Sequence, residues 1–134
     1  MTGTIKVLVA DKLSEEGIKL LKAEPQLSVD IKTGLSPQEL AAIVGPYHGL
    51  VVRSATKVTA EVIAAAKNLR VIGRAGVGLD NVDADAATQR GIIVMNVPAG
   101  NTISTAEHTV TMMLALARRV PQASASLRSG AWER

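Results

Sequence analysis

Short apolar runs alternate with helix-like stretches along the first 100 residues of this chain. Four runs have the composition of buried strands, at residues 5–10, 49–52, 69–72 and 92–96. A fifth, at residues 27–31, alternates apolar and polar residues as a half-exposed edge strand does. Strands that alternate with helices form right-handed crossovers in a parallel sheet. The sequence therefore predicts an α/β fold, a flavodoxin-like three-layer domain with a five-stranded parallel sheet, over residues 1–100.

The composition agrees with layers of aliphatic side chains. Of the 134 residues, 47% are hydrophobic but only 1% are aromatic, and Phe is absent, so the core must be built from Val, Ile, Leu, Ala and Met. The absence of cysteine excludes disulfides and thiolate chemistry. The net charge of +3 comes without a basic stripe or stacking aromatics, which argues against nucleic acid as a partner. No apolar run approaches the ~20 residues that span a bilayer, so we expect no membrane partner and a cytoplasmic protein.

Helix-start signals are clear at several points. Ser14 predicts an N-cap, and Ser36-Pro37-Gln38-Glu39 combines an N-cap, a proline at the first helical position and a capping-box glutamate. Ser104-Thr105-Ala106-Glu107 predicts a second capping box, which would open a long helix. This helix is apolar on nearly every side from residue 110 to 120, as in helices buried in a larger protein or against a partner. Pro121 is expected to kink or interrupt it.

Polar loops follow two neighbouring strands of the predicted sheet. Arg53 and Ser54 come directly after the third strand, and Gly76-Val77-Gly78 comes after the fourth. Ligands of open α/β sheets bind just beyond the carboxyl ends of the strands. A guanidinium can hold a carboxylate or phosphate through two hydrogen bonds, and glycines can turn backbone amides toward an anion, as in a nest. The two loops predict a pocket for a small anion, although the Arg53 loop alone fits an ordinary surface ion pair equally well.

Other kinds of site fit the sequence less well. A dinucleotide fingerprint would follow the first strand and open a long helix, whereas the glycines here follow the fourth strand and lead into a loop. The carboxylates form no metal-ligand cluster, so no metal site is predicted. A phosphoacceptor receiver domain would carry an aspartate after the third strand, where this chain has Arg53.

Five segments, in order along the chain, resemble one family. They are residues 52–59, 73–83, 91–96, 101–107 and 132–134. They resemble the D-isomer-specific 2-hydroxyacid dehydrogenases, and the first and last are most similar to the phosphoglycerate dehydrogenases of that family. The resemblance implies an NAD-dependent enzyme that oxidises a small phosphorylated hydroxy acid, 3-phospho-D-glycerate, to 3-phosphooxypyruvate in serine biosynthesis. It also implies a homo-oligomer.

The resemblance assigns roles residue by residue. Arg53 and Ser54 would hold the substrate phosphate, and the amides of Gly76, Val77 and Gly78 would hold its carboxylate. The remaining implied contacts lie further along the chain: Asn101 with substrate, Thr105 and Ala106 with the nicotinamide end of NAD, and Arg134 with the partner subunit's site. Val77 stands where some relatives have threonine, so a cofactor contact there would use its backbone.

The resemblance also implies a longer protein. Residues 1–100 would be its substrate-binding domain, and residues 101–134 an interdomain helix and the start of a truncated NAD-binding domain. No catalytic residue of the family matches this chain, so the chain alone is expected to be inactive. Two alternatives stay open: a sibling dehydrogenase that acts on glyoxylate, hydroxypyruvate or D-lactate, and a freestanding anion-binding module.

Overall fold

Five parallel strands form the sheet of this protein in the computed structural model, which describes residues 4–132. Their order across the sheet is β2-β1-β3-β4-β5. The strands are β1 (Ile5–Val9), β2 (Leu27–Ile31), β3 (Gly49–Val52), β4 (Val71–Arg74) and β5 (Ile93–Met95). Each consecutive pair in this order is parallel, and the order is that of flavodoxin-like folds. The predicted fold class is confirmed.

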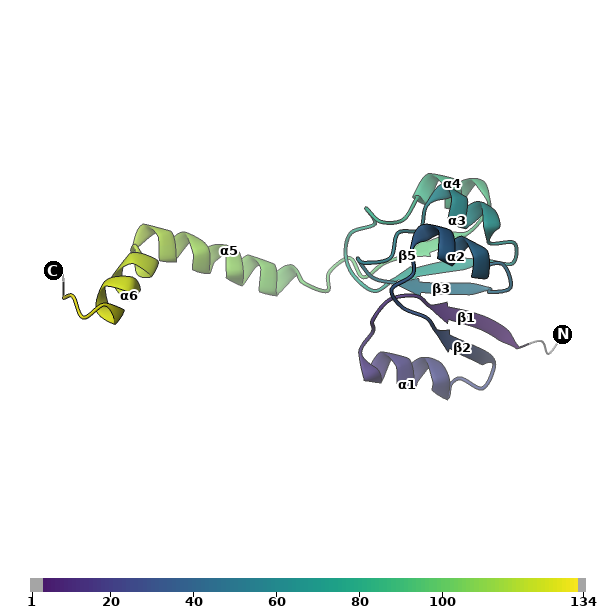
Figure 1. Ribbon diagram of the computed structural model, residues 1–134, viewed down its shortest axis with the longest axis horizontal. Helices are drawn as coiled ribbons and strands as arrows, with labels where there is room; N and C mark the ends of the chain where they lie inside the picture. Colours follow the sequence, from purple (N-terminus) through teal and green to yellow (C-terminus); the bar gives the residue numbers. More distant parts are fainter. Residues whose placement is uncertain (1–3, 133–134) are drawn as a thin grey trace. The chain divides into compact units, whose positions relative to one another are not determined.

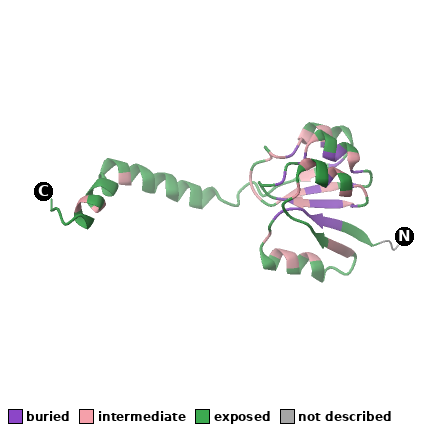
Figure 2. Cartoon of the chain, viewed as in Figure 1, coloured by how far each residue is buried: buried purple, intermediate pink, exposed green. Residues whose placement is uncertain are grey.

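Four helices connect the strands: α1 (Glu15–Ala23), α2 (Pro37–Ile43), α3 (Ala60–Ala65) and α4 (Ala84–Gln89). Helices α2, α3 and α4 cover one face of the sheet, and α1 lies on the other (Figure 1). The core lies under the three-helix face, where Leu8, Leu50 and Ile72 of the central strands pack with residues of these helices (Figure 2). The face with α1 is less covered, and Ile93 and Met95 of β5 are 63% and 55% exposed there.

The predicted helix starts of this sheet domain are confirmed. The Ser14 hydroxyl accepts the Gly17 amide at 3.2 Å at the start of α1. At the start of α2, the Ser36 hydroxyl accepts the Glu39 amide at 3.3 Å, and the Glu39 carboxylate accepts the Ser36 amide at 2.8 Å. Both bonds of the capping box are therefore present, and they satisfy two amides that the helix leaves without partners.

Residues 101–134 form a second compact unit, separate from residues 1–100. It contains α5 (Thr102–Ala117) and α6 (Val120–Arg128). The capping box predicted at Ser104 is wrong: α5 begins at Thr102, and the Ser104 hydroxyl donates to the Asn101 carbonyl at 3.1 Å. Asn101 is the N-cap residue, without a side-chain capping bond. A serine inside the first turn can bond back to a carbonyl instead of capping an amide, and here it does so.

The predicted long helix is two helices, because it breaks at Arg119. This residue takes a left-handed conformation, with φ 49° and ψ 41°, that residues with a side chain rarely adopt. Pro121 follows in the first turn of α6, where its missing N–H costs nothing, and the expected interruption is confirmed. Within residues 4–132 no helix is long and apolar enough to cross a bilayer.

Candidate anion site at the carboxyl ends of the strands

Three adjacent strands deliver polar groups to one edge of the sheet. Asp11 follows β1, Arg53 follows β3, and Gly76 follows β4. Because β1, β3 and β4 are neighbours and parallel, their carboxyl ends meet at the same edge. The two loops that the sequence singled out therefore lie next to each other.

Asp11 organises the loop after β3. The residue is only 8% exposed, and its carboxylate accepts four backbone amides: Arg53 at 3.0 Å, Ala55 at 3.0 Å, Thr56 at 3.1 Å and Lys12 at 2.9 Å. Burial acts to raise the pKa of Asp11, but the four donors, with Thr56 the largest, outweigh it and hold the pKa below its ordinary value. The carboxylate is thus charged at neutral pH, and the loop is folded around it.

Arg53 and Ser54 are both exposed at this edge. One guanidinium nitrogen of Arg53, Nη1, donates to the Lys12 carbonyl at 3.3 Å. Among residues 4–132, no acceptor is recorded for the Ser54 amide, although the amides at positions 53, 55 and 56 all reach Asp11. The loop therefore offers a guanidinium, a hydroxyl and an amide that an external anion could use.

Asn81 ties the two loops together. Its side-chain nitrogen donates to the Arg53 carbonyl at 2.5 Å and to the Thr56 carbonyl at 2.6 Å. Its side-chain oxygen accepts a hydrogen bond from the Arg74 Nε at 3.4 Å. The amide is thus oriented with its nitrogen toward the two carbonyls and its oxygen toward the arginine. A parallel bridge between Val58 and Val82 adds a second link. The loop after β3 is thus held from one side by Asp11 and from the other by the loop after β4.

The glycine loop after β4 differs from the predicted nest. Neither Gly76 nor Gly78 takes a left-handed φ, and the Gly76 amide already donates to the Arg74 carbonyl at 2.8 Å. A Cβ on Gly76 would collide with the Arg74 guanidinium, so this glycine makes room for that side chain. Two amides are left: within the described residues, none of the recorded hydrogen bonds uses the N–H of Val77 or Gly78.

The carbonyls of the glycine loop are held by the segment after β5. The Gly76 carbonyl accepts the Val97 amide at 2.9 Å, and the Val77 carbonyl accepts the Asn96 side chain at 2.7 Å. With its carbonyls engaged, the loop can present the Val77 and Gly78 amides to a ligand. An anion held by two such amides and by the Arg53 loop is chemically reasonable, since both loops offer donors.

The other predicted contacts belong to the second unit. Asn101 lies directly before α5, and Thr105 and Ala106 are exposed in its first turns. Arg134 lies outside the described residues. The roles that the resemblance implies for these residues remain predictions.

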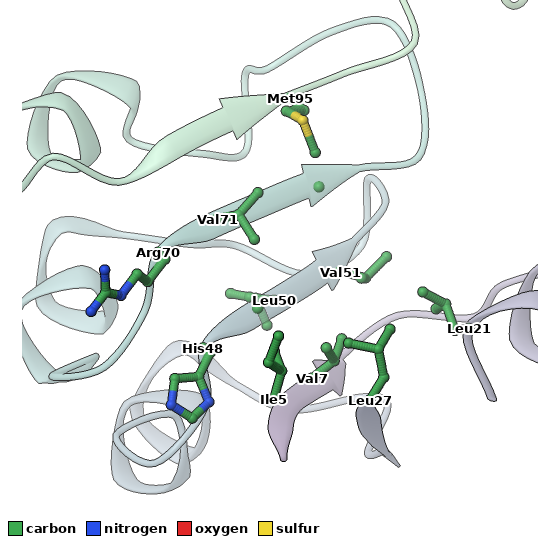
Figure 3. Close-up of a pocket in the computed structure, with 12 residues that line it drawn as sticks. Ile5, Val7, Leu21, Leu27, His48, Leu50, Val51, Arg70, Val71 and Met95 are labelled. Atoms are coloured by element: carbon green, nitrogen blue, oxygen red, sulfur yellow. The ribbon is translucent and has the colours of Figure 1, made fainter. Parts of the chain in front are cut away.

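A different hollow lies on the sheet face that carries α1. It has a volume of about 490 Å³ and is lined by Ile5, Val7, Leu27, Val51, Val71 and Met95, with His48 and Arg70 at one end (Figure 3). The surface that lines it is almost wholly apolar, so it offers an anion little polar surface to bind. It is a feature of the half-covered sheet face and not of the anion site.

Three residues of the site were not singled out from the sequence. They are Asp11, Asn81 and Asn96, and each acts by a side-chain bond to the backbone of a loop far along the chain. Asp11 had a usable signal, because a polar residue directly after a buried strand lies at the ligand edge of the sheet. Within residues 4–132, no group of three metal-ligating side chains is present.

Known proteins are similar to this chain over almost its full length. Residues 7–131 match the sequence model described as D-isomer specific 2-hydroxyacid dehydrogenase, catalytic domain. The chain belongs to this family. A D-3-phosphoglycerate dehydrogenase of Archaeoglobus fulgidus is 59% identical over 130 residues, which cover 97% of this chain and 24% of that protein. The chain thus spans about a quarter of the length of this relative.

Two solved structures have folds similar to that of this chain. A crystal structure of a protein from Pyrococcus horikoshii OT3 superposes with a TM-score of 0.84 at 35% identity, covering 97% of this chain and 38% of that one. The D-lactate dehydrogenase of Aquifex aeolicus, complexed with NAD and lactic acid, has a TM-score of 0.82 at 25% identity, covering 96% and 38%. The match extends across both units of the chain.

Proposed function

We propose that this chain is the substrate-binding portion of an NAD-dependent D-3-phosphoglycerate dehydrogenase, which oxidises 3-phospho-D-glycerate to 3-phosphooxypyruvate in serine biosynthesis. The observation that carries the proposal is the pair of linked loops at the carboxyl edge of the sheet, one cationic and one with free amides. A substrate with a phosphate at one end and a carboxylate at the other needs two such donor groups. The identity of 59% to an archaeal phosphoglycerate dehydrogenase supports this substrate over an unphosphorylated one.

In this proposal the loop after β3 binds the phosphate. Arg53 supplies a guanidinium, whose planar donors match phosphate oxygens, and Ser54 adds its hydroxyl and its free amide. The amides of Val77 and Gly78 bind the carboxylate, and Gly76 contributes space rather than a donor. Asn101, at the start of α5, makes a further contact to the substrate.

NAD would take up the hydride that leaves the hydroxyl-bearing carbon of the substrate. The resemblance gives the nicotinamide end of that cofactor the backbone of Val77 and, in the second unit, Thr105 and Ala106, whose side chains are exposed. The glycine loop does not open a helix, since α4 begins only at Ala84, so it lacks the geometry that binds a dinucleotide's pyrophosphate. We therefore propose that the domain absent from this chain holds most of the cofactor.

The same division implies the roles of the two units. Residues 1–100 would be the substrate-binding domain, and residues 101–134 the interdomain segment that leads into the NAD-binding domain, with Arg134 reaching the partner subunit's site. The protein would act in the cytoplasm as a homodimer. A phosphate ester is too strongly charged to cross a membrane freely, so its dehydrogenase is expected where the ester is made.

The proposal is tested by binding of 3-phospho-D-glycerate and of D-glycerate to the 134-residue chain, followed by amide chemical shifts. Arg53→Ala is expected to weaken binding of the phosphorylated acid by about 10- to 100-fold, because a charge-assisted bidentate contact is lost. D-glycerate should lose much less. The matched control is Arg70→Ala, which removes an exposed arginine before β4, at the opposite end of the strand.

Each other outcome has a definite meaning. Equal losses for both acids would favour a sibling dehydrogenase that acts on an unphosphorylated hydroxy acid. Oxidation of 3-phospho-D-glycerate by the purified chain with NAD, free of host enzyme, would overturn the assignment of the cofactor site to an absent domain.

A further inference from the structure

The loop that bears Arg53 has almost no internal support of its own. The recorded hydrogen bonds of its backbone between residues 53 and 56 run to Asp11 on one side and to Asn81 on the other. Neither partner is in the loop, and Asp11 comes more than 40 residues earlier in the chain. The shape of the loop is therefore set by these two side chains.

Asp11 positions the backbone of Arg53 directly and its guanidinium through Lys12. One carboxylate oxygen accepts the Arg53 amide, and the other accepts the Lys12 amide. The Lys12 carbonyl in turn accepts the Arg53 guanidinium. Asp11 thus orients the peptide that carries the arginine and also the peptide that its guanidinium contacts.

The bonds to Asp11 skip one residue of the loop. The amides of Arg53, Ala55 and Thr56 converge on a single carboxylate oxygen, whereas the Ser54 amide does not. The Thr56 hydroxyl adds a bond to the Ala10 carbonyl at 2.8 Å. Curling the loop around the carboxylate leaves Ser54 exposed, beside Arg53.

Asn81 completes the arrangement from the glycine loop. By donating to the carbonyls of Arg53 and Thr56, it closes the loop at its first and last residues. The same side chain accepts Arg74, whose guanidinium lies against Gly76. One amide side chain, that of Asn81, therefore connects the loop that bears Arg53 with the glycine loop, and it helps to set the distance between them.

We propose that Asp11 and Asn81 are positioning residues, which hold the Arg53–Thr56 loop in the shape that binds the phosphate of a hydroxy acid and set its spacing from the Val77 and Gly78 amides. The inference rests on the proposed function, because it assigns these residues to the same anion site. Neither residue needs to touch the substrate. Their effect is on selectivity for a phosphorylated acid, which a purely structural role would not alter.

The first test uses Asp11→Asn in the 134-residue chain. The substitution keeps the size of the side chain but replaces one acceptor oxygen by a donor. The amides of Arg53, Ala55 and Thr56 are expected to exchange faster with solvent even without ligand. Affinity for 3-phospho-D-glycerate should fall by about tenfold, since charge-assisted bonds are sensitive to misplacement, while affinity for D-glycerate changes little.

The matched control is Asp30→Asn, the same change in β2. It replaces the charged acceptor of the Tyr47 hydroxyl by a neutral amide with one acceptor oxygen, and it leaves the Arg53 loop untouched. A chain that is only less stable should behave like this control, with an unchanged ratio of the two affinities. Asn81→Ala provides a second variant if Asp11→Asn does not fold, and it is expected to change the ratio in the same direction.

The outcomes separate this proposal from the proposed function. If the unsubstituted chain binds no phosphorylated hydroxy acid, the proposed function fails, while the exchange experiment still reports on the loop. If it binds the acid, but Asp11→Asn leaves either the loop amides or the affinity ratio unchanged, the positioning role is overturned. Faster exchange together with a lowered ratio supports it.

Discussion

Tyr47 is a buried residue of the sheet domain whose pKa lies well above its ordinary value. It is 5% exposed, and its hydroxyl donates to the Asp30 carboxylate at 2.8 Å. Burial, helped by the negative charge of Asp30, raises the pKa of Tyr47 to about 12. The chain contains no other tyrosine, so tyrosinate absorbance reports on this residue alone.

This raised pKa predicts a loss of stability at alkaline pH. In the unfolded chain Tyr47 ionises near the usual value of about 10, but in the folded chain it stays neutral up to about pH 12. The contribution of Tyr47 to the free energy of unfolding is therefore full below about pH 10 and is lost as pH rises toward 12. Urea unfolding from about pH 8 to about pH 11.5, which covers most of this window, is expected to show a steeper decline for the unsubstituted chain than for Tyr47→Phe.

The control for this titration is the value at neutral pH. There Tyr47→Phe should cost only about 1 kcal/mol, the usual net worth of one hydrogen bond. Parallel curves for the two proteins across the alkaline range would contradict the assignment, because other groups would then account for the decline.

At the scale of the elements, helix starts show which sequence patterns carry structural information. Ser36 was predicted correctly, because Pro37 fixes where the helix begins and Glu39 returns the capping bond. Ser104 carries a similar pattern, yet α5 begins two residues earlier, at Thr102. A capping-box pattern alone does not determine at which residue a helix begins. Pro37 fixes the start of α2 after Ser36, whereas no proline follows Ser104 to fix a start there.

Ser36→Ala and Asn101→Ala should therefore differ in their effect on stability. Ser36→Ala removes a capping bond and is expected to lower the free energy of unfolding by about 1 kcal/mol. Asn101→Ala removes no side-chain capping bond and should leave stability within a few tenths of a kcal/mol, while it weakens binding of the proposed substrate. Urea unfolding and the ligand titration on the same samples measure both. A loss near 1 kcal/mol for Asn101→Ala would mean that its side chain caps α5 in solution.

The site shows the same limit of prediction. Arg53 and the glycine loop could be found because each directly follows an apolar run, and this position alone places them at the ligand edge. The roles of Asp11 and Asn81 depend on hydrogen bonds between distant segments, and no local pattern encodes such bonds. The sequence also could not show that the Gly76 amide is already used, because its bond to the Arg74 carbonyl depends on the local backbone conformation of the loop.

At the scale of the whole molecule, the second unit leaves its apolar residues without cover. Met113, Leu114 and Leu116 of α5 are 66%, 61% and 79% exposed. Soluble proteins rarely leave contiguous apolar surfaces of this kind exposed, and a second copy of the chain is the cover that we expect.

The prediction is that the chain self-associates in sedimentation experiments, with an average mass that rises with concentration. Leu116→Glu should weaken association by about tenfold or more, because each interface would bury an unpaired charge. The control is Gln38→Glu, which adds the same charge to an exposed position of α2. A monomer at every concentration, or equal effects of the two variants, would count against α5 as the interface.

The bonds to Asp11 also bear on how the chain reaches its folded state. They join groups that lie 42, 44 and 45 positions apart, and they need β1 and β3 to be already paired. Closing so long a segment costs chain entropy, so contacts of this kind form late and slowly. A newly made chain with only its local helices in place would have no anion site. If the proposed function holds, substrate therefore stabilises only the finished sheet and cannot trap a partly folded one.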